Sequence, residues 1–277
     1  MISNMTLVGC FISLFISLLL PIIALSVLSF KNKGGKVVSA WILGAAGFFV
    51  SQILIRTSIL SALQDMSWFM DFSENHMFLY AFTLAFTAGL VELAGRFAVA
   101  KILNAKTLNY KRSLAAGLGH GGIEAMILVG ITYLNNILYI IMINNGTFDA
   151  VVSDAVQSGV DVNALMQVKD QLISTAPTLF FLGGFERILA MTGHLAMSML
   201  VCYGVHTGKP LKCSLVCLGI HTLMDLTAGI NMLSGKGLSQ ATAYVIIYAI
   251  LMVMAALSLL IIRDIRRRWK ESEVIHV

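Results

Sequence analysis

Seven apolar segments divide this chain, and each is long enough to cross the roughly 30 Å hydrocarbon core of a bilayer. They cover residues 5–30, 37–62, 77–100, 113–143, 177–206, 211–232 and 239–262. Hydrophobic residues make up 58% of the 277 residues and charged residues only 12%, which is far from the composition of soluble domains. We therefore predict an all-α, polytopic transmembrane helical bundle of about seven spans, with residues 1–277 forming a single integral membrane domain in the cell membrane.

The charges between the spans predict how the bundle is oriented. Basic residues follow spans one, three, five and seven, whereas the segments after spans two and four are acidic. The positive-inside rule then places the N-terminus outside and the C-terminus in the cytoplasm. Residues 144–176 would form an extracellular insert whose apolar spacing predicts a short amphipathic helix. The net charge of +5 comes from basic residues between the apolar segments, where such residues orient a membrane protein. We therefore expect membrane lipid as a partner and no nucleic acid.

Ionisable residues also lie inside four of the predicted spans. Three spans carry a pair four residues apart: Glu92/Arg96, His120/Glu124 and His221/Asp225. Span five adds Glu186, Arg187 and His194. A spacing of four puts both members of a pair on one helix face. Because a charge at the bilayer centre costs at least ~2.5–3.5 kcal/mol, such residues predict a functional site within the membrane.

The predicted topology gives these groups a common depth. With a rise of about 1.5 Å per residue, the depth from the cytoplasmic boundary is between about 10 and 21 Å for Glu92, His120, Glu124, His194, His221 and Asp225. Glu186 and Arg187 lie nearer the outer side, where we expect a second layer. A structural reading remains for each group alone, since an intramembrane ion pair or histidine can simply fix helix packing.

Two kinds of chemistry fit this set of side chains. A carboxylate beside neutral imidazoles can deprotonate a water, and other histidines can donate to a developing oxyanion. Alternatively, His120, Glu124 and His221 could hold a divalent metal with an open coordination position. The spacing does not separate these two alternatives. Neither a GxSxG serine elbow nor an HExxH zincin helix occurs in the sequence.

The ordered motifs resemble a known family. They are Glu92-x-x-x-Arg96, Gly119-His120-Gly121-Gly122-x-Glu124, Glu186-Arg187 with His194, and His221-x-x-x-Asp225. This set is similar to the YhfC family of glutamic-type intramembrane proteases, which is related to type II CAAX prenyl endopeptidases, CPBP proteins and PrsW. The resemblance covers about residues 77–232. It implies a four-helix catalytic core around a water-filled cavity, a membrane-embedded or membrane-proximal peptide substrate and no obligatory cofactor, with a divalent metal left open.

One position departs from the wider superfamily motif, Glu-Glu-x-x-x-Arg, whose first glutamate is usually taken as the general base. That position is Val91 here, and Glu92 matches the second glutamate. The base would then be Glu92 or Glu124, or activity would have been lost. We favour Glu124, which shares a helix face with His120.

The working hypothesis has Glu124, His120 and His221 activating the water. The groups expected to orient the site are Glu92, Arg96 and Asp225, and His194 is a further candidate catalytic residue. Two other functions stay open for the same sequence. Val91 favours a catalytically inactive scaffold or receptor of the same fold, and buried Glu/His groups also suit the proton relay of a proton-coupled transporter.

Overall fold

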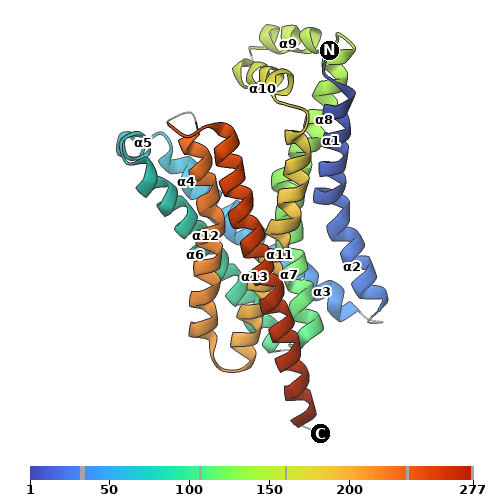
Figure 1. Ribbon diagram of the computed structural model, residues 1–277, viewed down its shortest axis with the longest axis vertical. Coiled ribbons are helices and arrows are strands. Elements are labelled where there is room, and N and C mark those ends of the chain that lie inside the picture. Colours follow the sequence, from blue (N-terminus) through green and yellow to red (C-terminus); the bar gives the residue numbers. More distant parts are fainter. Residues whose placement is uncertain (32–34, 106–107, 160, 235–236, 276–277) are drawn as a thin grey trace. The chain divides into compact units, whose positions relative to one another are not determined.

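The computed structural model describes residues 1–31, 35–105, 108–159, 161–234 and 237–275, and Figure 1 follows them along the chain. Apart from one isolated bridge between Ser234 and Leu238, the regular structure in these ranges is helical. Seven helical stretches are long and apolar enough to cross a membrane. They are Asn4–Phe30, Lys36–Leu63, Met77–Asn104, Tyr110–Asn144, Leu179–His206, Pro210–Met232 and Gln240–Glu271. The predicted all-α fold with seven spans is thus confirmed.

Four of the spans are single helices and three contain a π-helical stretch. The single helices are α6 (Met77–Asn104), α11 (Leu179–His206), α12 (Pro210–Leu233) and α13 (Gln240–Ile275). The interrupted spans are α1 (Asn4–Leu14), η1 (Phe15–Leu19) and α2 (Leu20–Phe30); α3 (Gly35–Phe48), η2 (Phe49–Thr57) and α4 (Ser58–Leu63); and α7 (Tyr110–Glu124), η3 (Ala125–Gly130) and α8 (Ile131–Asn144). Such π stretches are rare and frequently mark functional sites.

Three shorter helices lie between spans. They are α5 (Ser67–Asn75), α9 (Phe148–Gln157) and α10 (Asn163–Ser174). The insert at 144–176 therefore forms two helices where the sequence predicted one. A salt bridge from Lys169 to Asp149, with 2.6 Å between Nζ and Oδ1, ties α10 to α9.

The chain forms two compact units. Unit 1 comprises Met1–Leu20 and Ala125–Ile188, and unit 2 comprises Pro21–Glu124 and Leu189–Val277. In unit 1, the Ser13 hydroxyl of α1 donates to the Phe180 carbonyl (2.6 Å) and accepts from the Gly184 N–H (2.9 Å). Because Ser13 is fully buried, these bonds fix α1 against the start of α11.

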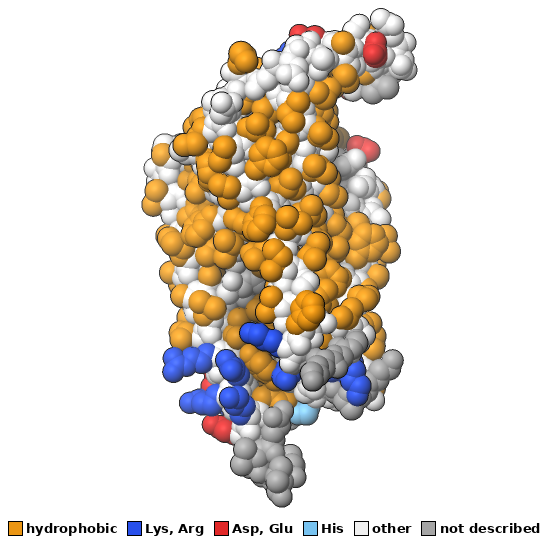
Figure 2. Space-filling view, turned by 90° about the vertical axis from the view of Figure 1, so that its right-hand side faces the viewer, with side chains coloured by type: hydrophobic (Ala, Val, Ile, Leu, Met, Phe, Trp, Pro, Cys, Tyr) orange, Lys and Arg blue, Asp and Glu red, His pale blue; other side chains and the backbone are white. Residues whose placement is uncertain are grey.

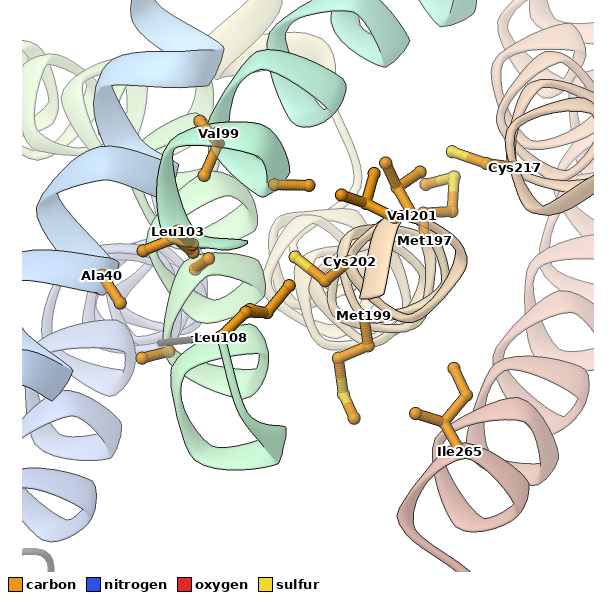
Figure 3. Packing of buried hydrophobic residues seen from close by; sticks show 14 of the residues in the cluster. Ala40, Val99, Leu103, Leu108, Met197, Met199, Val201, Cys202, Cys217 and Ile265 are labelled. Carbon is orange, nitrogen blue, oxygen red and sulfur yellow. The ribbon is translucent and has the colours of Figure 1, made fainter. Parts of the chain in front are cut away.

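Unit 2 has a hydrophobic core built around the second half of α11. Met197, Met199, Val201 and Cys202 of this helix lie among buried residues of α3, α6, α12 and α13 (Figure 3). The residues labelled on those helices include Ala40, Val99, Leu103, Cys217 and Ile265. The core thus surrounds the half of α11 that carries His194.

Helices α3 and α7 of unit 2 approach each other so closely that their backbones touch. A Cβ atom on Gly119 would lie 2.0 Å from the Trp41 carbonyl oxygen, and one on Gly44 would lie 1.9 Å from the Ala116 carbonyl oxygen. The contact is reciprocal, since each helix presents a glycine to a carbonyl of the other. Small residues allow this packing between membrane helices. At these positions glycine is required by close helix contact, and this contact positions the stretch of α7 that carries His120.

The surface of the spans is rich in hydrophobic side chains. Figure 2 shows them spread over the face that it draws, with Lys and Arg side chains gathered at one end. Large apolar residues such as Leu211, Val245 and Leu259 are more than half exposed. Apolar surface on this scale is expected where helices face lipid.

Candidate active site

Glu92 of α6 is the centre of a buried polar cluster in unit 2. Its Oε2 accepts hydrogen bonds from Arg96 Nη2 at 3.1 Å and from the Nε2 atoms of His120 and His221, each at 2.9 Å. All four side chains are at most 4% exposed. The bonds join α6 to α7 and α12, so one carboxylate oxygen connects three spans.

His194 of α11 links Arg96 to the second glutamate. Arg96 Nη2 lies 2.7 Å from His194 Nδ1, and His194 Nε2 lies 2.9 Å from Glu124 Oε2. A guanidinium group cannot accept a hydrogen bond, so Nδ1 must be the acceptor. The proton of a neutral ring is then on Nε2, the nitrogen that faces Glu124. Arg96 therefore fixes both the orientation and the tautomer of His194.

Asp225 is the outermost member of the cluster. Its Oδ2 lies 3.3 Å from His221 Nδ1, and its side chain is 36% exposed. The imidazole rings also pack on one another: those of His120 and His194 stack with their centroids 5.6 Å apart, and those of His194 and His221 meet edge-on at 5.3 Å. Asp225 thus extends the buried cluster toward the surface of unit 2.

Glycines bring the helices of the site together. A Cβ on Gly121 of α7 would lie 2.9 Å from His194 Cβ, and a Cβ on Gly89 of α6 would lie 3.3 Å from His221 Cβ. Any larger residue would push α7 from α11, or α6 from α12. The distances between the histidines and the carboxylates therefore depend on these two positions.

The structure brings the predicted candidates together in a pattern that the spacing did not specify. His120 and Glu124 share a face of α7, yet His120 bonds to Glu92 of α6, and Glu124 meets His194 of α11. Glu186 and Arg187 lie in the part of α11 that belongs to unit 1, where they pair with each other. Their role as a second layer stays a prediction.

Arg56 is a charged residue of the spans that the sequence analysis did not single out. It lies in the π-helical stretch η2, donates from Nη2 to the Leu84 carbonyl at 2.8 Å, and is acted on electrostatically by Asp225 and Glu92. The cost of charge in a membrane should have identified it, because it interrupts the apolar segment 37–62. Arg56 has no ionisable residue four positions away, since Gln52 and Leu60 stand there, so the pair spacing does not reveal it.

Four donors of the cluster could hold a metal ion. Glu92, His120, Glu124 and His194 each offer one ligand atom, and these atoms lie within 4.8 Å of one another. Carboxylate oxygen and imidazole nitrogen are ordinary zinc ligands, so the set fits a divalent ion by donor type and by convergence. His194 can join such a set only if Arg96 releases Nδ1, since a neutral imidazole has a single lone pair to offer.

The fold and the cluster together define a multi-pass membrane protein with a buried carboxylate–imidazole site inside its spans. Residues 16–251 match the family model described as YhfC intramembrane metalloprotease, and the chain belongs to this family. It is also 30% identical over 212 residues to a Bacillus subtilis (strain 168) protein described as uncharacterized membrane protein YhfC. The aligned region covers 76% of this chain and 80% of the relative. No solved structure matches the chain. The family resemblance predicted from the motifs is confirmed.

Proposed function

We propose that this protein is an intramembrane peptidase that hydrolyses a peptide bond of a membrane-embedded or membrane-proximal protein. The name of its family supports this class of enzyme. The observation that carries the proposal is the buried cluster of Glu92, Arg96, His120, Glu124 and His194 inside spans, where ionisable groups are otherwise costly. Hydrolysis there requires a polar site that excludes lipid, and this cluster provides one.

Glu124 is the glutamate that we assign as general base. Oε2 of Glu92 accepts N–H groups from three side chains, and hydrogen bonds to the charged form of a carboxylate make it a weaker base. Glu124 is nearer the edge of the cluster, with its side chain 11% exposed, against 4% for Glu92. His194 Nε2, which carries the proton of a neutral ring, lies 2.9 Å from Glu124 Oε2. Glu92 is then the anchor that orients the histidines.

The proposed reaction uses the chain's own groups. Glu124 takes a proton from water as the oxygen attacks the substrate carbonyl carbon, and it returns this proton to the amine that leaves. Nε and Nη1 of Arg96 are buried and have no hydrogen-bond partner among the described side chains and backbone. Because unsatisfied buried donors are rare, we assign these N–H groups to stabilising the charge on the substrate oxygen.

A divalent metal would bind at Glu92, His120, Glu124 and His194. When bound, such an ion polarises a carbonyl and eases the ionisation of water. Arg96 decides between the two states of the site, because its bond to His194 Nδ1 keeps the proton of a neutral ring on Nε2, where a metal ligand would need a lone pair. The glutamic and metal-dependent mechanisms therefore differ in whether this hydrogen bond persists.

Cleavage of a library of membrane-span peptides by the purified protein, followed by mass spectrometry, tests the proposal. We expect Glu124→Gln to lower the rate by about 10²–10⁴-fold, the usual contribution of a general base, without loss of stability. Glu92→Gln should lower both rate and stability, and Glu74→Gln, on the exposed face of α5, is the control. Full activity of Glu124→Gln would refute its assignment as base. Loss of activity with a chelator, restored by zinc, would establish the metal-dependent form. No cleavage by any form would favour a scaffold or transporter.

A further inference from the structure

A basic cavity lies in unit 2 where the end of α13 meets the start of α7. It has a volume of ≈ 380 Å³ and is lined by Asn109, Tyr110, Lys111, Arg266, Trp269 and Lys270. None of these lining residues is acidic. The size is within the range of about 300–1,000 Å³ that is usual for small-molecule sites. Neither the polar cluster nor the proposed peptidase reaction involves any of these residues.

Among the described residues, no acidic side chain pairs with the charges that line this cavity. Asp264 of α13 pairs with Arg267 at 2.7 Å and with Arg268 at 2.6 Å. By contrast, no ion pair is recorded for Lys111, Arg266 or Lys270 within the described ranges. Arg266 and Lys270 are four residues apart and share a face of α13. On α13, Arg267 and Arg268 are therefore paired with Asp264, whereas Arg266 and Lys270 line the cavity.

Trp269 forms a rigid wall of the cavity. It is 2% exposed, and its ring stacks on His206 with a centroid distance of 5.3 Å and meets the ring of Tyr203 edge-on at 5.4 Å. Both partners belong to α11. Tyr110, which also lines the cavity, approaches Trp269 at 6.4 Å. Tryptophan and tyrosine are enriched where a span leaves the hydrocarbon for the headgroup layer.

Exposed apolar side chains of α13 also precede the cavity-lining residues along the helix. Leu259 and Leu260 of α13, one to two turns before Arg266, are each 59% exposed. A molecule with a phosphate in the cavity could therefore lay an acyl chain along these leucines. The predicted topology puts this end of α13 at the cytoplasmic leaflet, where anionic lipids concentrate.

We propose that this cavity binds the phosphate of an anionic phospholipid headgroup. Lys111, Arg266 and Lys270 supply the positive charge, and Trp269 supplies the wall at headgroup depth. A free phosphate compound shares the charge but does not use the adjoining leucines, so we assign the lipid as the ligand. Because the cavity contacts both α7 and α13, the lipid would hold these two helices together.

Thermal unfolding of the purified protein in detergent tests this proposal, with native mass spectrometry counting bound lipid. The probes are phosphatidylglycerol, phosphatidylcholine, glycerol 3-phosphate and inorganic phosphate. The double variant Arg266→Gln/Lys270→Gln is compared with Arg267→Gln/Arg268→Gln, which removes the same charge from the same helix on its other face. We expect phosphatidylglycerol to raise the unfolding midpoint of the wild type and of the Arg267/Arg268 control, and to bind at least tenfold more weakly to the Arg266/Lys270 variant.

Several results would overturn it. Equal binding to both double variants would mean that charge alone attracts the lipid. An equal shift with phosphatidylcholine would remove the headgroup from the interaction, and an equal shift with inorganic phosphate or glycerol 3-phosphate would make the ligand a soluble phosphate. If the Arg266/Lys270 variant does not fold, Lys111→Gln, on an exposed side chain of α7, replaces it and should show the same selective loss.

Discussion

Replacing Gly119 by alanine would place a methyl group against the backbone of α3. The added Cβ would lie 2.0 Å from the Trp41 carbonyl oxygen, and real Cβ contacts are not shorter than 3.0 Å. Helices α3 and α7 would therefore have to separate by about 1 Å, since a backbone carbonyl cannot swing away as a side chain can. His120 is the next residue, so its bond to Glu92 would lengthen by a comparable amount.

Two opposing terms set the size of the effect. Overpacking costs about 1–3 kcal/mol, and the higher helix propensity of alanine returns up to about 1 kcal/mol. We expect a net loss of about 1–2 kcal/mol in the free energy of unfolding, which corresponds to about 2–4 °C per kcal/mol in a protein of similar size. Displacing a reacting group by 1 Å costs about 10²-fold in rate, so cleavage should fall much more than stability.

Gly219→Ala is the matched control for Gly119→Ala. Gly219 is exposed on α12 two residues before His221, and a Cβ there meets nothing within 4 Å. This variant should keep its activity and gain up to about 1 kcal/mol from helix propensity. Thermal unfolding and cleavage are measured on both proteins in the same detergent. A Gly119→Ala protein as stable and active as the wild type would show that α3 and α7 do not touch as described.

Two other substitutions probe separate parts of the molecule. Arg56→Gln removes a cation that acts on Asp225 and a donor to α6, and we expect peptide cleavage to fall about tenfold, equivalent to about 1.4 kcal/mol; an unchanged rate would mean that Arg56 only fixes packing. Ser13→Ala removes the two hydrogen bonds that join α1 to α11, each worth about 0.5–1.5 kcal/mol, so unit 1 should lose about 1–3 kcal/mol in chemical unfolding. Ser17→Ala is its control, since this buried hydroxyl has no partner among the described residues, and equal losses in both would contradict the reasoning.

The positions of the spans could be predicted because the length of each apolar segment can be read from the sequence. The segment 77–100 became α6, Met77–Asn104, and the segment 177–206 became α11, Leu179–His206. The π-helical stretches could not be predicted in this way, because they leave hydropathy unchanged. The insert was predicted to hold one helix, yet α9 and α10 form around a turn at Gly159, whose positive φ of 73° suits glycine.

The contacts between the site residues could not be predicted from their spacing in the sequence. An i,i+4 pair shows which side chains share a helix face, but not whether they bond to each other or to a third helix. His120 bonds to Glu92 of α6, whereas Glu124 lies against His194 of α11. These contacts depend on the rotation of α7 and on the close approach of α6 and α11. The close packing at Gly89, Gly119 and Gly121, and the identity of the neighbouring helices, required the structure.

The position of Glu92 at the centre of the cluster changes what Val91 implies about activity. Successive residues of a helix point about 100° apart, so a glutamate at position 91 could not share the three donors that converge on Glu92. Position 91 of α6 carries valine, but α7 brings Glu124 to within 2.9 Å of His194, which is bonded to Arg96. In the proposed mechanism, the carboxylate that anchors the site and the one that takes the proton therefore come from different helices. Movement of α7 against α6 would then change the distance between these two carboxylates, so the proposed mechanism requires the tight contact of α7 with α3.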